Sequence, residues 1–126
     1  MNFQPARAEM IHLHEEMFPK YKEYCLTVSE RGMAVSIETM VYMRWLCEAL
    51  DAKRVADLGS GYSSFVLRQY QATHEGVEVL SVDDSPEWLD KTAEWLKAND
   101  LPADGLIGPD EWRAGGEPFD VILHDY

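Results

Sequence analysis

The sequence is poor in cysteine and in long hydrophobic stretches, and both shortages narrow the class of protein. Its two cysteines, Cys25 and Cys47, lack the CxxC spacing of redox and zinc sites, so we expect free thiols in a reducing compartment. No apolar run approaches the roughly 18 residues that a membrane-spanning helix needs. The first residues also lack the apolar segment of a secretory signal. We therefore expect a cytoplasmic protein without a membrane partner.

Positive charge is also scarce. Eleven Lys and Arg residues stand against 23 Asp and Glu residues, which gives a formal net charge of -12. Such a surface repels phosphate backbones, and the one adjacent basic pair is Lys53-Arg54. We expect no nucleic-acid partner.

A metal-binding motif is missing as well. His12 and His14 stand next to Glu15 and Glu16, but residues two apart on a helix do not share a face. We expect no bound metal.

The hydrophobic content of 46% over 126 residues suffices for one core. Residues 1–35 are predicted to be a helical lead-in that Pro19 interrupts, with a second short helix after the proline. Ser36 is predicted to cap the helix that opens the remaining domain, residues 36–126.

From Lys53 onward the sequence alternates between strand and helix patterns. The fold class that this pattern predicts is α/β, with a mostly parallel sheet and helices on both faces. Ligands of such sheets bind at the carboxyl ends of the strands, and acidic residues converge at the predicted ends: Asp57, Asp83, Asp84, Asp110 and Asp125. Strands are predicted at 53–58, 77–82, 104–108 and 119–125, and helices at 63–74 and 85–100.

The first strand runs into a glycine turn, "VADLGSGYSS". A dinucleotide fingerprint would read Gly-x-Gly-x-x-Gly, but Ser64 stands in place of the third glycine and Asp57 precedes the first, Gly59. A carboxylate repels a pyrophosphate and attracts the sulfonium and amino groups of S-adenosylmethionine. The turn therefore favours S-adenosylmethionine over NAD. Asp83, 24 positions after Gly59, lies where a βαβ unit places an acid against ribose hydroxyls.

Three segments in order, "VADLGSGYSS", "VLSVDDSPEWL" and "FDVILHDY", resemble the first, second and fourth motifs of the class I S-adenosylmethionine-dependent methyltransferases. "SIET" is similar to the lead-in helix of many small-molecule O-methyltransferases. The resemblance covers residues 36–126 and implies a Rossmann-like fold. The sequence departs from the family at Ser63, where the usual third glycine is absent; a serine there is small and can cap the following helix.

The resemblance implies a role for each matching position. Asp57 and the turn would hold the methionine end of the cofactor, Asp83 and Asp84 the ribose, and the turn after the third strand would border the adenine. Trp112 in that turn would either stack on the base or cover the sheet. Asp125 would face the sulfonium and the acceptor, with His124 as the second candidate for catalysis. The full set is Asp57, Gly59, Ser60, Gly61, Tyr62, Ser63, Asp83, Asp84, Asp110, Glu111, Trp112, His124 and Asp125.

The sequence thus predicts an S-adenosylmethionine-dependent methyltransferase with a small-molecule acceptor. The alternative is a non-catalytic module that binds S-adenosylmethionine or a nucleotide, such as an assembly subunit. The family's sheet has seven strands, so we expect a form truncated after the fourth. The apolar edge of that strand, residues 121–123, would be covered by a second copy or by a partner chain.

Overall fold

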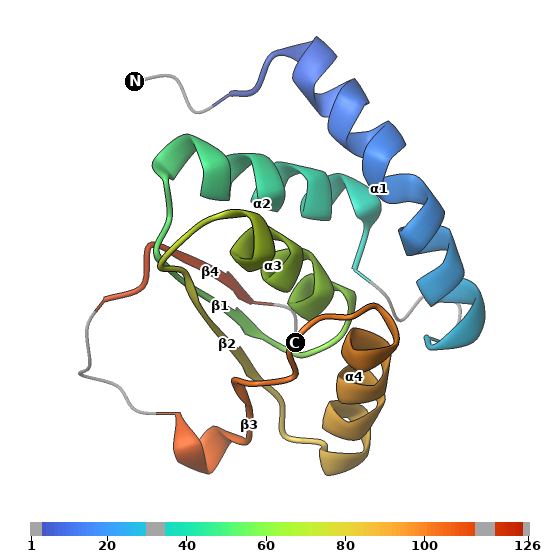
Figure 1. Cartoon of the computed structure of the whole chain (residues 1–126), viewed down its shortest axis with the longest axis vertical. Helices are drawn as coiled ribbons and strands as arrows, with labels where there is room; N and C mark the ends of the chain where they lie inside the picture. The colour runs from blue at the N-terminus through green and yellow to red at the C-terminus, as the bar shows by residue number, and fades with distance from the viewer. Residues whose placement is uncertain (1–3, 30–34, 113–117, 125–126) are drawn as a thin grey trace.

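The computed structural model of the chain describes residues 4–29, 35–112 and 118–124. Helices and strands alternate after two N-terminal helices (Figure 1). The α-helices are α1 (Arg7–Thr27), α2 (Ile37–Leu50), α3 (Tyr62–Thr73) and α4 (Pro86–Ala98), and a short 3₁₀ helix, η1, spans Pro109–Glu111. The strands are β1 (Arg54–Leu58), β2 (Glu78–Val82), β3 (Leu106–Ile107) and β4 (Val121–His124).

The four strands form one parallel sheet in the order β3-β2-β1-β4. This is a Rossmann-like α/β arrangement, and it confirms the α/β class and the parallel sheet expected from the sequence. At the carboxyl end of the sheet, Leu58 is in register with Val82 on one side and His124 on the other. The ends of β1, β2 and β4 therefore meet at one edge, where ligands of such sheets bind.

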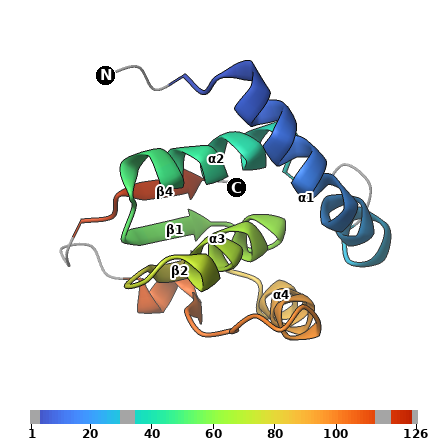
Figure 2. The ribbon, with the colours of Figure 1, turned by 45° about the horizontal axis from the view of Figure 1, so that its top comes forward.

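The core lies between the helices and one face of the sheet. Figures 1 and 2 show α3 packed on β1 and β2, with α2 beside β4. Val55, Val79 and Val121 contribute to the buried apolar cluster from the sheet. Met17 and Tyr24 of α1 belong to the same cluster. Thus α1 is packed on the core that supports the sheet.

The break expected at Pro19 is wrong, because α1 is a single helix of 21 residues with Pro19 inside it. An interior proline removes one backbone hydrogen bond and crowds the preceding turn. Met17 and Tyr24, on either side of the proline, are both buried. We infer that this packing holds both halves of the helix in line.

The predicted cap at Ser36 is confirmed, because its hydroxyl accepts from the Thr39 amide at 3.3 Å. Ser85 caps α4 in the same way and accepts from the Trp88 amide at 3.2 Å. Within the ranges that the structure describes, no helix is both long enough and apolar enough to cross a membrane.

Candidate functional site

The turn between β1 and α3 stands at the carboxyl edge of the sheet, and its residues are buried. Gly59 and Gly61 have φ angles of 109° and 153°, in the region that favours glycine. A Cβ on Gly61 would lie 2.8 Å from the Tyr24 hydroxyl of α1. The turn therefore needs glycine at position 61 both for its backbone angle and for the close approach of α1.

Asp57 lies beneath this turn and has no exposed surface. Its Oδ2 accepts hydrogen bonds from Ser63 Oγ at 2.6 Å and Ser64 Oγ at 2.7 Å, and its Oδ1 accepts from the Ser81 hydroxyl. Burial raises the pKa of Asp57, while these three hydrogen bonds and the charge of Arg68 act in the opposite direction. The carboxylate thus faces the interior between α3 and the sheet.

Ser63 and Ser64, at the start of α3, have different structural roles. Ser64 Oγ accepts from the Gly61 amide at 3.1 Å, so the capping suggested for Ser63 is performed by Ser64. Ser63 donates to Asp57. Together they connect the turn to the acid below it.

Asp83 follows β2 and holds the other side of the turn. Its Oδ2 accepts from the Ser60 amide at 2.9 Å and from Ser60 Oγ at 3.0 Å, and its Oδ1 accepts from the Ser85 amide at 2.9 Å. A carboxylate has about four acceptor sites, so Oδ1 can accept one more donor. Asp83 is 7% exposed, and Asp84 beside it is exposed. The structure therefore brings Asp83 and the glycine turn together, as the sequence suggested.

The predicted adenine-side residues are placed differently. Asp110 and Glu111 are exposed in η1. The Trp112 ring stacks on Phe119 with 5.3 Å between ring centroids, and the Arg54 guanidinium lies 4.2 Å from the Phe119 centroid. Because Arg54 begins β1, this stack lies toward the amino end of the strand. The structure does not bring Trp112 to the glycine turn.

His124 ends β4 at the carboxyl edge and is exposed. It is in register with Leu58, and alternation along β1 directs Leu58 to the face opposite Asp57. Asp125, the first candidate for catalysis, lies outside the described residues.

Sequence reasoning missed Arg68 and Ser81, which are both fully buried behind Asp57. Arginine is almost never fully buried unless it is paired, so within "FVLRQYQ" it reads as a solvent-facing residue. One available signal was the four-residue spacing from Ser64, which places Arg68 on the same face of α3 as the turn.

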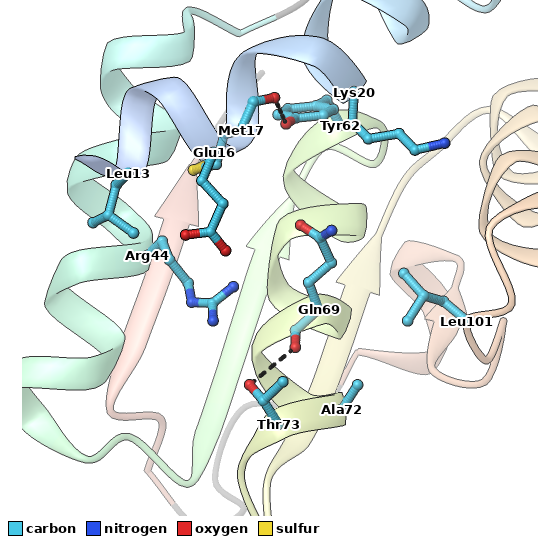
Figure 3. A pocket seen from close by; sticks show the side chains of 10 residues that line it. All are labelled: Leu13, Glu16, Met17, Lys20, Arg44, Tyr62, Gln69, Ala72, Thr73 and Leu101. Atoms are coloured by element: carbon cyan, nitrogen blue, oxygen red, sulfur yellow. Dashed lines mark hydrogen bonds between the residues drawn. The ribbon is translucent and has the colours of Figure 1, made fainter. Parts of the chain in front are cut away.

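A hollow of about 250 Å³ lies between α1, α2 and α3 (Figure 3). Of the predicted site residues, it includes only Tyr62, whose hydroxyl donates to the Met17 carbonyl at 3.4 Å. The residues that line this hollow are Leu13, Glu16, Met17, Lys20, Arg44, Tyr62, Gln69, Ala72, Thr73 and Leu101.

Among the residues that the structure describes, no group of three or more His, Cys, Asp or Glu side chains is arranged to hold a metal ion.

Comparison with known proteins identifies the fold. No protein-family model matches the sequence, and no curated protein does. The S-adenosylhomocysteine-bound methyltransferase PaMTH1 of Podospora anserina superimposes with a TM-score of 0.68 at 19% identity, covering 100% of this chain and 61% of that one. The chain shares its fold with the covered part of this methyltransferase.

Two further solved structures agree. The O-methyltransferase TomG of Streptomyces achromogenes, in complex with S-adenosylmethionine, gives a TM-score of 0.61 at 18% identity over 98% of this chain and 55% of its own. An O-methyltransferase of Bacillus cereus, in complex with S-adenosylhomocysteine, gives 0.59 at 16% identity over 96% of this chain and 55% of its own. The chain thus spans between 55% and 61% of the length of these three proteins.

Proposed function

We propose that the protein is an S-adenosylmethionine-dependent methyltransferase that acts on a small-molecule acceptor. One observation carries the proposal: Asp83, at the end of β2, holds the glycine turn at the end of β1 through two hydrogen bonds from Ser60. This arrangement occurs in a fold shared with methyltransferases whose solved structures contain S-adenosylmethionine or its demethylated product.

In this proposal each residue of the edge has its own role toward the cofactor. The unused acceptor position on Asp83 Oδ1 suits a ribose hydroxyl, and Asp84 is exposed next to it. The backbone from Gly59 to Ser63 would adjoin the methionine end. We assign Asp57 to fixing this turn from below, because its carboxylate is fully buried and accepts hydrogen bonds from three serines of the chain.

On the adenine side, Asp110 and Glu111 remain candidates because both are exposed. Trp112 would have to leave its stack on Phe119 to reach a base. We therefore rank the two acids before Trp112.

The cofactor supplies a methyl group already activated on a sulfonium. The protein has to align the acceptor and, for a hydroxyl acceptor, remove its proton. We propose Asp125 as the first candidate for this base and His124, exposed at the end of β4, as the second. Asp83 would orient the nucleoside and so fix the direction from which the acceptor must approach.

The edge of the sheet supports a proposal about a partner. Among the described strands β4 pairs with β1 alone, and Ile122 on β4 is 50% exposed. Open apolar strand edges readily pair with another strand. We propose that a second copy of the chain covers this edge.

The function is tested by incubating the protein with methyl-labelled S-adenosylmethionine and a panel of phenols, carboxylic acids and amines. We expect label on at least one acceptor, and no transfer by the Asp83→Ala variant. Binding of the cofactor without transfer to any acceptor would support the alternative, a non-catalytic binding module. Absence of both binding and transfer would contradict the proposal.

A further inference from the structure

We propose that Arg68 is a positioning residue for the cofactor site: from within the core it fixes the glycine turn and the entry into β3 relative to each other. This inference rests on the proposed function. Arg68 itself has no exposed surface and therefore reaches the site only through other residues.

The guanidinium of Arg68 is bonded to three separate parts of the chain. Its Nη1 donates to the Ser64 carbonyl at 3.1 Å and to Ser81 Oγ at 2.8 Å, and its Nη2 donates to the Asp104 carbonyl at 2.9 Å. These partners belong to the first turn of α3, to β2 and to the segment before β3. One planar group thus sets the spacing of three elements.

The first connection leads to the glycine turn. Ser81 accepts from Arg68 and donates to Asp57, so one hydroxyl links the buried cation to the buried carboxylate. Asp57 in turn holds Ser63 and Ser64 at the start of α3. A buried charge without a partner is strongly unfavourable, so the cation stabilises the ionised carboxylate that orders the turn.

The groups that face Asp57 are few. Ser63 and Ser64 approach from α3 and Ser81 from β2, while the residue in register on β4 is the apolar Leu123. The charge of Arg68 lowers the pKa of Asp57 against the effect of burial. Burial lowers the pKa of Arg68, while the charges of Asp57 and then Asp104 act in the opposite direction.

The second connection leads to β3 and the turn that follows it. Gly105, next to Asp104, has a φ of 81°, and a Cβ there would overlap the Val79 carbonyl oxygen of β2. The Ser81 amide donates to the Gly105 carbonyl at 2.8 Å. Because Arg68 holds the Asp104 carbonyl at this point of close contact, it also holds the start of β3, from which η1 continues.

The test measures S-adenosylhomocysteine affinity by calorimetry from mildly acidic to mildly alkaline pH, with urea unfolding of each variant. The full-length variants are Arg68→Met, Arg68→Lys, Ser81→Ala, Asp57→Asn and the double variant Asp57→Asn/Arg68→Met. Lys97→Met serves as the control, because it removes the same charge from the exposed last turn of α4.

We expect Arg68→Met to weaken binding about tenfold near neutral pH, the effect of losing a hydrogen-bonded charge. In Arg68→Met, Asp57 lacks the nearby cation and therefore becomes protonated at a higher pH. The loss of affinity should be greatest at acidic pH and should diminish as the pH rises. Arg68→Lys should restore the wild-type pH profile in part. The double variant should bind S-adenosylhomocysteine more weakly than Asp57→Asn does, by a factor that does not vary with pH.

An equal loss at every pH with no recovery in Arg68→Lys would overturn the inference, because Arg68 would then be merely structural. Wild-type affinity in Arg68→Met would overturn it too. Should Arg68→Met not fold, Ser81→Ala decides: it keeps both charges but cuts their link, and an unchanged pH profile contradicts the inference. If the wild-type chain binds no S-adenosylhomocysteine, both the inference and the proposed function are overturned. The results for the variants bear on the role of Arg68 and not on the proposed function.

Discussion

At the scale of single residues, the carboxylates of Asp57 and Asp83 accept hydrogen bonds from different parts of the turn between β1 and α3. Asp57 holds the start of α3 from inside the core, and Asp83 holds Ser60 from the edge of the sheet. Only Asp83 keeps both some exposure and an unused acceptor position. It is therefore the acid that we expect a ligand to touch.

Replacing Asp83 with Asn keeps the shape of the side chain and removes its charge. We expect the Kd for S-adenosylhomocysteine to rise about tenfold or more, since hydrogen bonds to a charged group are worth about 1.5–3 kcal/mol. Calorimetry measures this change. Asp90→Asn, on the exposed face of α4, is the matched control and should bind as the wild type does. Equal affinities in the two variants would remove Asp83 from the site.

The two cysteines test the packing at α2. Cys47 is fully buried and burial raises its pKa to about 12, whereas Cys25 on α1 is partly exposed. Because the thiolate is the reactive form, a thiol reagent at neutral pH should label Cys25 in the folded protein and Cys47 only on unfolding. Mass spectrometry of Cys25→Ser and Cys47→Ser distinguishes the two sites. Rapid native labelling of Cys25→Ser would contradict the packing described for α2.

At the scale of elements, the short strand β3 depends on the backbone at Gly105. We expect Gly105→Ala to lower the free energy of unfolding by about 3 kcal/mol or more, since left-handed strain and a steric overlap combine there. Gly76→Ala has a similar φ, 75°, with nothing within 4 Å of the added methyl. Gly76→Ala should lower the free energy of unfolding by only about 1–2 kcal/mol. Equal losses in urea unfolding would contradict the close contact between Gly105 and β2.

Most of the elements could be predicted because hydrophobic periodicity and capping residues are local signals. The carboxyl ends of β1 and β2, with Gly59 and Asp83, follow from the same local patterns. Pro19 misled the prediction because tertiary packing on either side of it outweighs one lost hydrogen bond. Trp112 and Arg68 depend on long-range partners, Phe119 in one case and Ser81 and Asp104 in the other. No spacing within the sequence specifies such partners.

At the scale of the whole molecule, the open edge at β4 predicts self-association. Sedimentation of the wild-type chain should show a dimer, and Ile122→Glu should shift it toward a monomer by placing a charge in the paired edge. Leu26→Glu is the control, because Leu26 is 75% exposed on α1. It should leave the dimer intact. A strictly monomeric and stable wild-type chain would contradict covering of the edge by a second copy.

We propose that the turn between β1 and α3, with Asp83 beside it, is the part of the molecule that binds S-adenosylmethionine. The most direct measurement is calorimetric titration of the wild-type chain with S-adenosylmethionine, S-adenosylhomocysteine and NAD under one set of conditions. We expect saturable binding of the first two and none of NAD. Saturable binding of NAD, with no heat from either adenosyl compound, would contradict the proposal.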